Sequence, residues 1–158
     1  IEACKKAGVA LAYKAINEKD KVGLIVFGSE VKEAIEPTLD FTRLLKEITR
    51  IRASKETDIV STLQKAIEMF PSESITKHLI LITDALPTKG DEPEKSTLEE
   101  ASIARSKGIT ISLIGINLDE KGKKLAEKIV ELGEGRLYIV RNLENVDQIV
   151  LEDYYSVG

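Results

Sequence analysis

The sequence is poor in the residues that build most redox and metal centres: it has one cysteine, one histidine and no tryptophan in 158 residues. A single cysteine, Cys4, rules out an internal disulfide, which suits a reducing compartment. His78 has no second His and no Cys beside it in sequence, so we expect a solvated or helix-flanking histidine and not a metal ligand. Because residues 1–10 also lack a secretory pattern, a cytoplasmic protein is expected.

Long apolar runs and excess positive charge are missing as well. No stretch reaches about 18 uninterrupted apolar residues, so no membrane span is expected. The formal net charge is −4, which argues against a broad nucleic-acid-binding face. The chain has neither a Gly-x-Ser-x-Gly elbow nor a Gly-x-Gly-x-x-Gly or Gly-Lys-Ser/Thr loop, so hydrolase and nucleotide sites lack their usual motifs. We therefore predict a protein that is not an enzyme.

What is present is a balanced globular composition, with 42% hydrophobic and 32% charged residues. The length fits one domain, residues 1–158, with one core. The charge comes largely from Lys and Glu, a bias typical of proteins from hot environments.

Apolar periodicity predicts helices alternating with short buried strands. This order favours an α/β fold: a doubly wound, mainly parallel sheet with one antiparallel edge hairpin and helices on both faces. Pro37 is expected to end the second strand, and Ser96 to Glu99 fit a capping box that starts a helix. Strands are predicted at 22–27, 31–36, 79–82, 109–116 and 137–140, and helices at 1–17, 41–51, 59–70, 96–107, 125–132 and 145–155.

The first helix has an apolar face but no strand before it, although a strand normally feeds such a helix in a doubly wound sheet. The apolar residues follow a helical period from Ile1 onward, and the first residue is Ile and not Met. We therefore expect that the chain starts inside a larger product, and that a gap lies beside Leu79–Ile82 in the sheet centre. Exposed strand edges invite pairing, so instability or oligomerisation is expected.

Ligands of open parallel sheets bind outside the carboxyl ends of the strands. The predicted strand Leu79–Ile82 leads straight into Thr83 and Asp84, so a rigid element holds the Asp84 carboxylate. The polar loop 52–58 can reach the same edge. From sequence alone, Asp84 fits a turn residue as well as a ligand. Thr57 fits a helix cap as well as a ligand, and Asp58 fits a helix-start charge better than a ligand.

Three segments resemble von Willebrand factor type A domains. Leu79–Pro87 (LILITDALP) is similar to the family's strand that ends in Thr-Asp-Gly, with Ala85 in place of the usual Gly. Lys55–Leu63 (KETDIVSTL) is similar to the loop that brings a Thr to the same site, and Val22–Val31 (VGLIVFGSEV) to the second strand and hairpin. The element order agrees over the whole chain.

The resemblance implies a metal-ion-dependent adhesion site for Mg²⁺ or Mn²⁺, in which Thr57 and Asp84 are ligands. The family's Asp-x-Ser-x-Ser motif, which follows the first strand, is absent here, so the site is expected to be incomplete. The resemblance also implies a protein partner that supplies an acidic residue to the metal, and an AAA+ ATPase as a possible associate.

Two other interpretations stay open. The domain could be structural, with no working metal site. The other is a phospho-acceptor or enzyme on a flavodoxin-like sheet that uses Asp84. We rank it lower, because no acidic cluster or neighbouring Lys accompanies Asp84 at a strand end.

Overall fold

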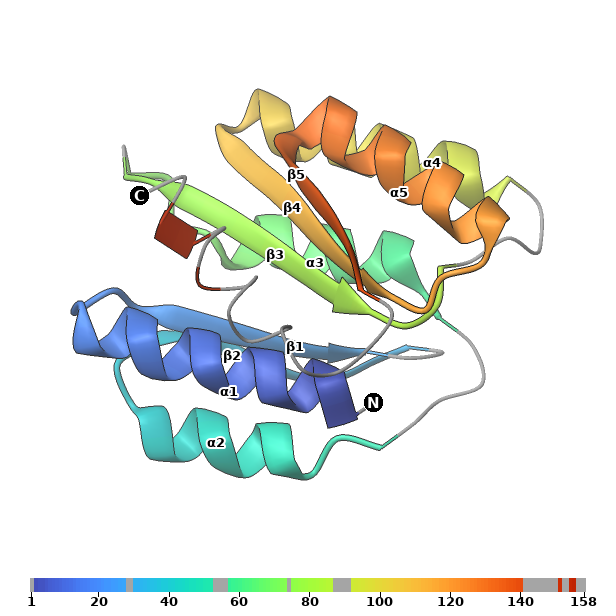
Figure 1. The fold of residues 1–158 in the computed structure, drawn as a ribbon. Helices are drawn as coiled ribbons and strands as arrows, with labels where there is room; N and C mark the ends of the chain where they lie inside the picture. Colours follow the sequence, from blue (N-terminus) through green and yellow to red (C-terminus); the bar gives the residue numbers. More distant parts are fainter. Residues whose placement is uncertain are drawn as a thin grey trace.

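The structure is a computed structural model that describes residues 2–27, 30–52, 57–73, 75–86, 92–140, 151 and 154–155. Helices and strands alternate along the chain in nearly the predicted order (Figure 1). The elements are α1 (Glu2–Asn17), β1 (Val22–Phe27), β2 (Val31–Thr38), α2 (Phe41–Thr49), α3 (Ile59–Met69), β3 (Lys77–Thr83), α4 (Pro93–Ser106), β4 (Ile109–Ile116), α5 (Glu120–Gly133) and β5 (Glu134–Val140).

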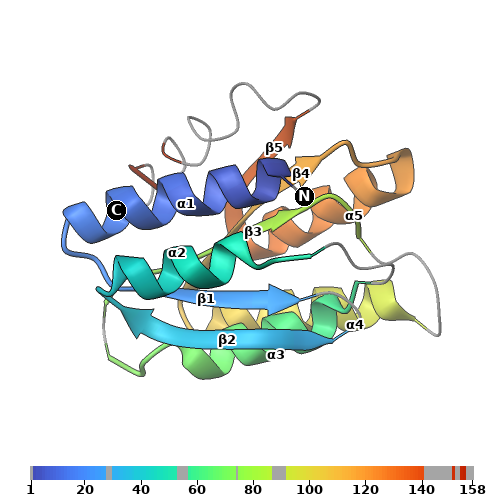
Figure 2. The ribbon, with the colours of Figure 1, turned by 90° about the horizontal axis from the view of Figure 1, so that it is seen from below.

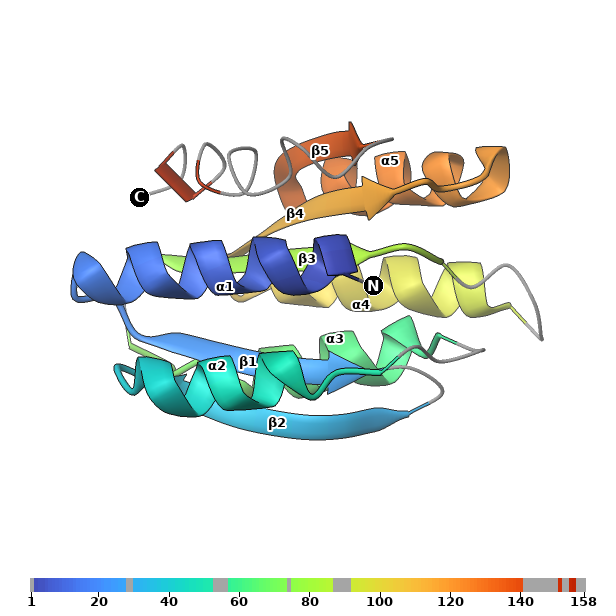
Figure 3. The same cartoon turned by 60° about the horizontal axis from the view of Figure 1, so that its bottom comes forward.

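The strands form two hydrogen-bonded groups. The strands β1 and β2 pair as an antiparallel hairpin, and β3, β4 and β5 form a parallel sheet in that order. The two groups lie in one layer, in the spatial order β2, β1, β3, β4, β5 (Figures 2 and 3). The hairpin and the parallel sheet confirm the predicted doubly wound α/β class.

Helices cover both faces of this layer. On one face, α1 and α2 pack over the strands, and on the other face lie α3, α4 and α5 (Figure 3). The central strand β4 is buried along almost its whole length, which is why its sequence, ITISLIGI, is nearly continuously apolar. Its odd-numbered residues Ile109 to Leu113 join the core under α3, α4 and α5, and Ile114 and Ile116 join the core under α1.

Aspartates start three of the helices, as their sequence positions suggest. Asp40 accepts a hydrogen bond from the backbone N–H of Arg43 at 3.2 Å and caps α2. Asp119 accepts from the backbone N–H of Gly122 at 2.7 Å and caps α5. These caps satisfy donors that the first helical turn leaves without partners, and they fix where each helix leaves the sheet.

Several predicted boundaries were wrong. The helix α5 begins at Glu120 and not at Leu125, because Asp119 caps it. The strand β2 runs through Pro37 to Thr38, because the proline lies on an edge strand where a missing N–H costs little. The helix α4 begins at Pro93, a residue suited to the first helical position, and not at the Ser96 capping box. The strand β5 begins at Glu134, directly after α5. Most of the helix predicted at 145–155 lies outside the described residues.

Candidate metal site at the carboxyl edge of the sheet

The predicted site residues lie at the edge of the sheet where the parallel strands end, which we call the carboxyl edge. The strand β3 ends at Thr83, and Asp84 follows it. Thr57 lies just before α3, and this helix runs back along the sheet so that it begins at the same edge (Figure 1). The helix α1 also begins there, beside the tips of β1 and β3 (Figure 2). The fold therefore brings Thr57 and Asp84 to one edge.

A tight turn fixes the backbone around Asp84. The buried Thr83 donates its hydroxyl to the carbonyl of Ala85 at 2.6 Å, and the same oxygen accepts from the N–H of Ala85 at 3.2 Å. With Thr83 turned inward, Asp84 is exposed at the edge. A carboxylate mounted this way, directly after a rigid strand, is well placed to contact a ligand.

The start of α3 assigns a clear role to Asp58. Its carboxylate accepts from the backbone N–H of Ser61 at 3.0 Å and from the Ser61 hydroxyl at 2.7 Å. Asp58 is therefore the helix cap, where the sequence predicted only a helix-start charge, and the alternative in which Thr57 caps this helix is wrong. Thr57 lies half-buried one residue before the cap.

The edge also brings the start of α1 close to Asp84. Burial, and after it the negative charge of Asp84, raises the pKa of the Cys4 thiol to about 11. Sequence reasoning did not connect these two residues, because their proximity depends on where α1 crosses the sheet and not on any local pattern. Cys4 is partly buried and packs with the apolar cluster under α1.

The donor set suits a hard cation but is incomplete. Mg²⁺ prefers six oxygen ligands and usually keeps several waters. Thr57 offers a hydroxyl and Asp84 a carboxylate, both oxygen donors. Across the described residues, no group of three or more His, Cys, Asp or Glu side chains is arranged to hold a metal ion. Thr57 and Asp84 can thus supply two ligands, and the remaining positions need water or other groups.

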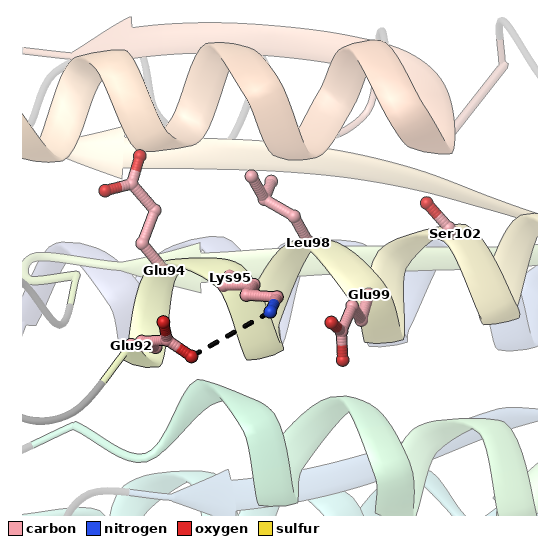
Figure 4. A pocket seen from close by; sticks show the side chains of 6 residues that line it. All are labelled: Glu92, Glu94, Lys95, Leu98, Glu99 and Ser102. Carbon is pink, nitrogen blue, oxygen red and sulfur yellow. Dashed lines mark ion pairs between the residues drawn. The ribbon is translucent and has the colours of Figure 1, made fainter.

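A shallow hollow lies elsewhere, along α4 (Figure 4). Glu92 pairs with Lys95 at 3.9 Å within the hollow, and Glu94 pairs with Lys128 of α5 at 3.0 Å. The acidic residues Glu92 and Glu94 are therefore paired on the helix surface, and the neighbouring Asp91 lies outside the described residues. All six lining residues come from the α4 segment: Glu92, Glu94, Lys95, Leu98, Glu99 and Ser102.

Comparison with known families decides the assignment of the fold. The family model described as von Willebrand factor type A domain matches residues 6–152. The chain belongs to this family. Domains of the von Willebrand factor type A family are generally non-enzymatic modules for protein interaction. No curated protein matches the chain.

Solved structures share this von Willebrand factor A fold at low sequence identity. An aerotolerance-related membrane protein from Bacteroides fragilis is 20% identical, with 98% of this chain and 88% of that chain covered and a TM-score of 0.78. BatB from Bacteroides thetaiotaomicron is 21% identical, with 94% and 85% covered and a TM-score of 0.74. The vWF domain of the type V pili tip protein Mfa5 from Porphyromonas gingivalis is 14% identical, with 99% and 89% covered and a TM-score of 0.78.

These similarities establish the fold. Although one of these proteins is described as a membrane protein, none of the described helices of this chain is both long and apolar enough to cross a bilayer.

Proposed function

We propose that this von Willebrand factor A domain binds a protein partner at the carboxyl edge, through a Mg²⁺ or Mn²⁺ ion that Thr57 and Asp84 help to hold. The observation that carries the proposal is the placement of these two oxygen donors at one edge, where strand β3 and helix α3 present them. This is the edge at which open parallel sheets bind their ligands.

The local structure supports the roles of the two side chains. The turn made by Thr83 and Ala85 leaves the Asp84 carboxylate exposed, where it can bind a cation and still face solvent. Both oxygens of the Asp58 carboxylate accept hydrogen bonds from Ser61, whereas the neighbouring Thr57 offers a hydroxyl oxygen to a cation. A bound Mg²⁺ would supply positive charge and an open position for a carboxylate oxygen of the partner.

The proposal is one of recognition and not of catalysis. The partner is expected to present a Glu or Asp to the edge, and an AAA+ ATPase is a candidate because of the family resemblance. The chief alternative is a structural domain with no working metal site. A phospho-acceptor role for Asp84 ranks lower, because no cluster of acidic side chains surrounds it in the described structure.

Calorimetry on the full-length protein tests the proposal with two titrants. The first is Mg²⁺, and the second is a short peptide with one glutamate, added with Mg²⁺ or with a chelator. We expect Mg²⁺ to bind, and the peptide to bind only when Mg²⁺ is present. The same peptide with glutamine should not bind, because a neutral amide is a poor ligand for a hard cation.

Two variants locate the site. Asp84→Asn should abolish both binding events, and Asp40→Asn, a change to a capping carboxylate at the opposite end of the sheet, should leave them intact. Absence of Mg²⁺ binding in the wild-type protein would favour the structural alternative, and equal peptide binding in chelator would exclude a metal-mediated contact.

A further inference from the structure

The strand β5 ends the layer of strands on the side opposite to β2 (Figure 3). Among the described residues, β5 pairs with β4 alone, so no strand lies along its outer side. The outer N–H and C=O groups of a strand in this position can pair with another chain. We call the outer side of residues 136–139 the β5 edge.

The edge strand at the other end, β2, carries features that oppose such pairing. Lys32, Glu33 and Glu36 are exposed along it, and Pro37 removes one backbone N–H. Its register with β1 also shifts twice, and irregularities of this kind bend an edge away from a straight partner. The strand β2 is therefore a poor acceptor for an added strand.

The β5 edge lacks these features beyond Arg136. Leu137, Tyr138 and Ile139 follow it without a charge or a proline, and their register with β4 is regular. Ile139 is 37% exposed, although it is a large apolar residue. A regular, apolar and exposed strand edge favours pairing with another strand.

Helix α5 extends the surface beside the β5 edge. Lys128 of α5 pairs with Glu94 of α4 at 3.0 Å, so that side of α5 faces α4. Glu127 and Lys123 are turned from Lys128 by about 100° and 140° in the same sense, which places them on the other side of the helix. Lys123 also pairs with Glu120 at 3.2 Å. The open side of α5 thus carries opposite charges one turn apart.

We propose that the β5 edge binds a second copy of this chain, with the two β5 strands antiparallel about a two-fold axis at Leu137. This register places Arg136 of each copy opposite Tyr138 of the other. The two side chains share one face of the sheet, because they are two residues apart. A guanidinium beside a tyrosine ring is an attractive pair. The chain therefore carries both halves of a contact that the axis repeats twice.

The helices favour a second copy over a short peptide as the occupant. Pairing over residues 136–139 spans only about 13 Å and buries far less than the ~800 Å² per partner of a stable interface. In the antiparallel arrangement, α5 of the second copy runs beside α5 of the first. Lys123 of each copy then faces Glu127 of the other, so the helices add both area and charge complementarity.

This arrangement keeps dimerisation separate from metal binding. Because the two β5 strands are antiparallel, the carboxyl edges of the two copies point in opposite directions. One metal ion cannot then be shared between the copies, so a chelator should leave the dimer intact.

Sedimentation of the full chain in a chelator tests the proposal. We expect a reversible dimer with a Kd on the order of micromolar. Ile139→Lys should raise this Kd at least about tenfold, because a charged side chain on an edge strand opposes pairing. Ile103→Lys is the matched control: Ile103 lies on α4 and is 42% exposed, so the change should leave the Kd unchanged.

An exchange of charges on α5 tests the same arrangement without altering the strand. Lys123→Glu should weaken the dimer, because it brings glutamates together across the axis. Addition of Glu127→Lys to this variant should restore the wild-type Kd, since each glutamate then faces a lysine again.

Three outcomes would overturn the proposal. A chain that stays monomeric at millimolar concentration would show that the β5 edge binds no second copy. A dimer that Ile139→Lys leaves intact would have its interface elsewhere. Failure of the double variant to regain the affinity that Lys123→Glu had lost would contradict the antiparallel arrangement of the helices.

Discussion

The carboxylate of Asp84, at the end of β3, acts on the thiol of Cys4, in the first turn of α1. Burial contributes most, and the charge of Asp84 adds to it, so the pKa of Cys4 rises from its ordinary value of 9.0 to about 11. This coupling links α1 to the edge at which we propose that a ligand binds. It shows that the candidate site is bounded by a helix whose start is distant in sequence from Asp84.

Removing the charge of Asp84 should lower the pKa of Cys4. In Asp84→Asn the thiolate no longer faces a negative carboxylate, so the pKa should fall below 11. It should stay above 9.0, because the larger effect of burial remains. The pH dependence of Cys4 alkylation measures this shift, with Asp40→Asn as the control that should leave it unchanged. An identical profile in Asp84→Asn would contradict the proximity of the two residues.

Asp58 should prove to be a structural cap. Asp58→Ala removes the acceptor for the N–H and hydroxyl of Ser61, so it should lower the free energy of unfolding by about 1 kcal/mol. Asp58→Asn keeps a capping oxygen and should cost less. Chemical denaturation measures both. If Asp58→Asn abolished metal binding while stability stayed the same, Asp58 would be a ligand and our assignment of Thr57 would need revision.

Two glycine substitutions should change stability in opposite directions. A Cβ on Gly135 would lie 1.9 Å from the backbone oxygen of Ile111, so Gly135→Ala should disturb the pairing of β4 with β5 and cost about 1–3 kcal/mol. A Cβ on Gly8 would lie 3.7 Å from Ile48, an ordinary contact. Gly8→Ala should therefore stabilise α1 by about 0.5–1 kcal/mol through helix propensity.

Thermal or chemical unfolding of the two variants checks this pair. A neutral Gly135→Ala would mean that β5 pairs with β4 less closely than the structure shows.

The sequence predicted the fold class because its strands and helices carry different apolar periods. The run Ile109–Ile116 has apolar residues at both odd and even positions, which is typical of a strand covered on both faces. Boundaries were harder. Pro37 lacks a backbone N–H, so local chemistry predicts that a strand ends there. The strand β2 continues through it because β2 lies at the edge of the sheet, where that N–H has no strand to bond. Edge positions follow from the order of strands in the sheet, which no local sequence pattern encodes.

The candidate site was predictable in part. Asp84 could be placed because it directly follows a strand, and Asp58 because aspartates start helices. The nearness of Cys4 to Asp84 depends on tertiary packing. The environment of His78 also depends on tertiary packing. We expected a solvated side chain, but His78 lies half-buried within β3 and makes a 3.1 Å hydrogen bond with the buried Ser112 of β4. That contact requires the β3–β4 register, which pairs strands 32 residues apart (His78 opposite Thr110).

Electron paramagnetic resonance of Mn²⁺ added to the full-length protein tests the proposed metal site most directly. Free Mn²⁺ gives a strong signal that weakens when the ion binds to protein. We expect the signal to weaken with wild-type protein and with Asp40→Asn but not with Asp84→Asn. With Thr57→Val it should weaken less than with wild type. An equal loss of signal in wild type and Asp84→Asn would contradict a metal site at this edge of the sheet.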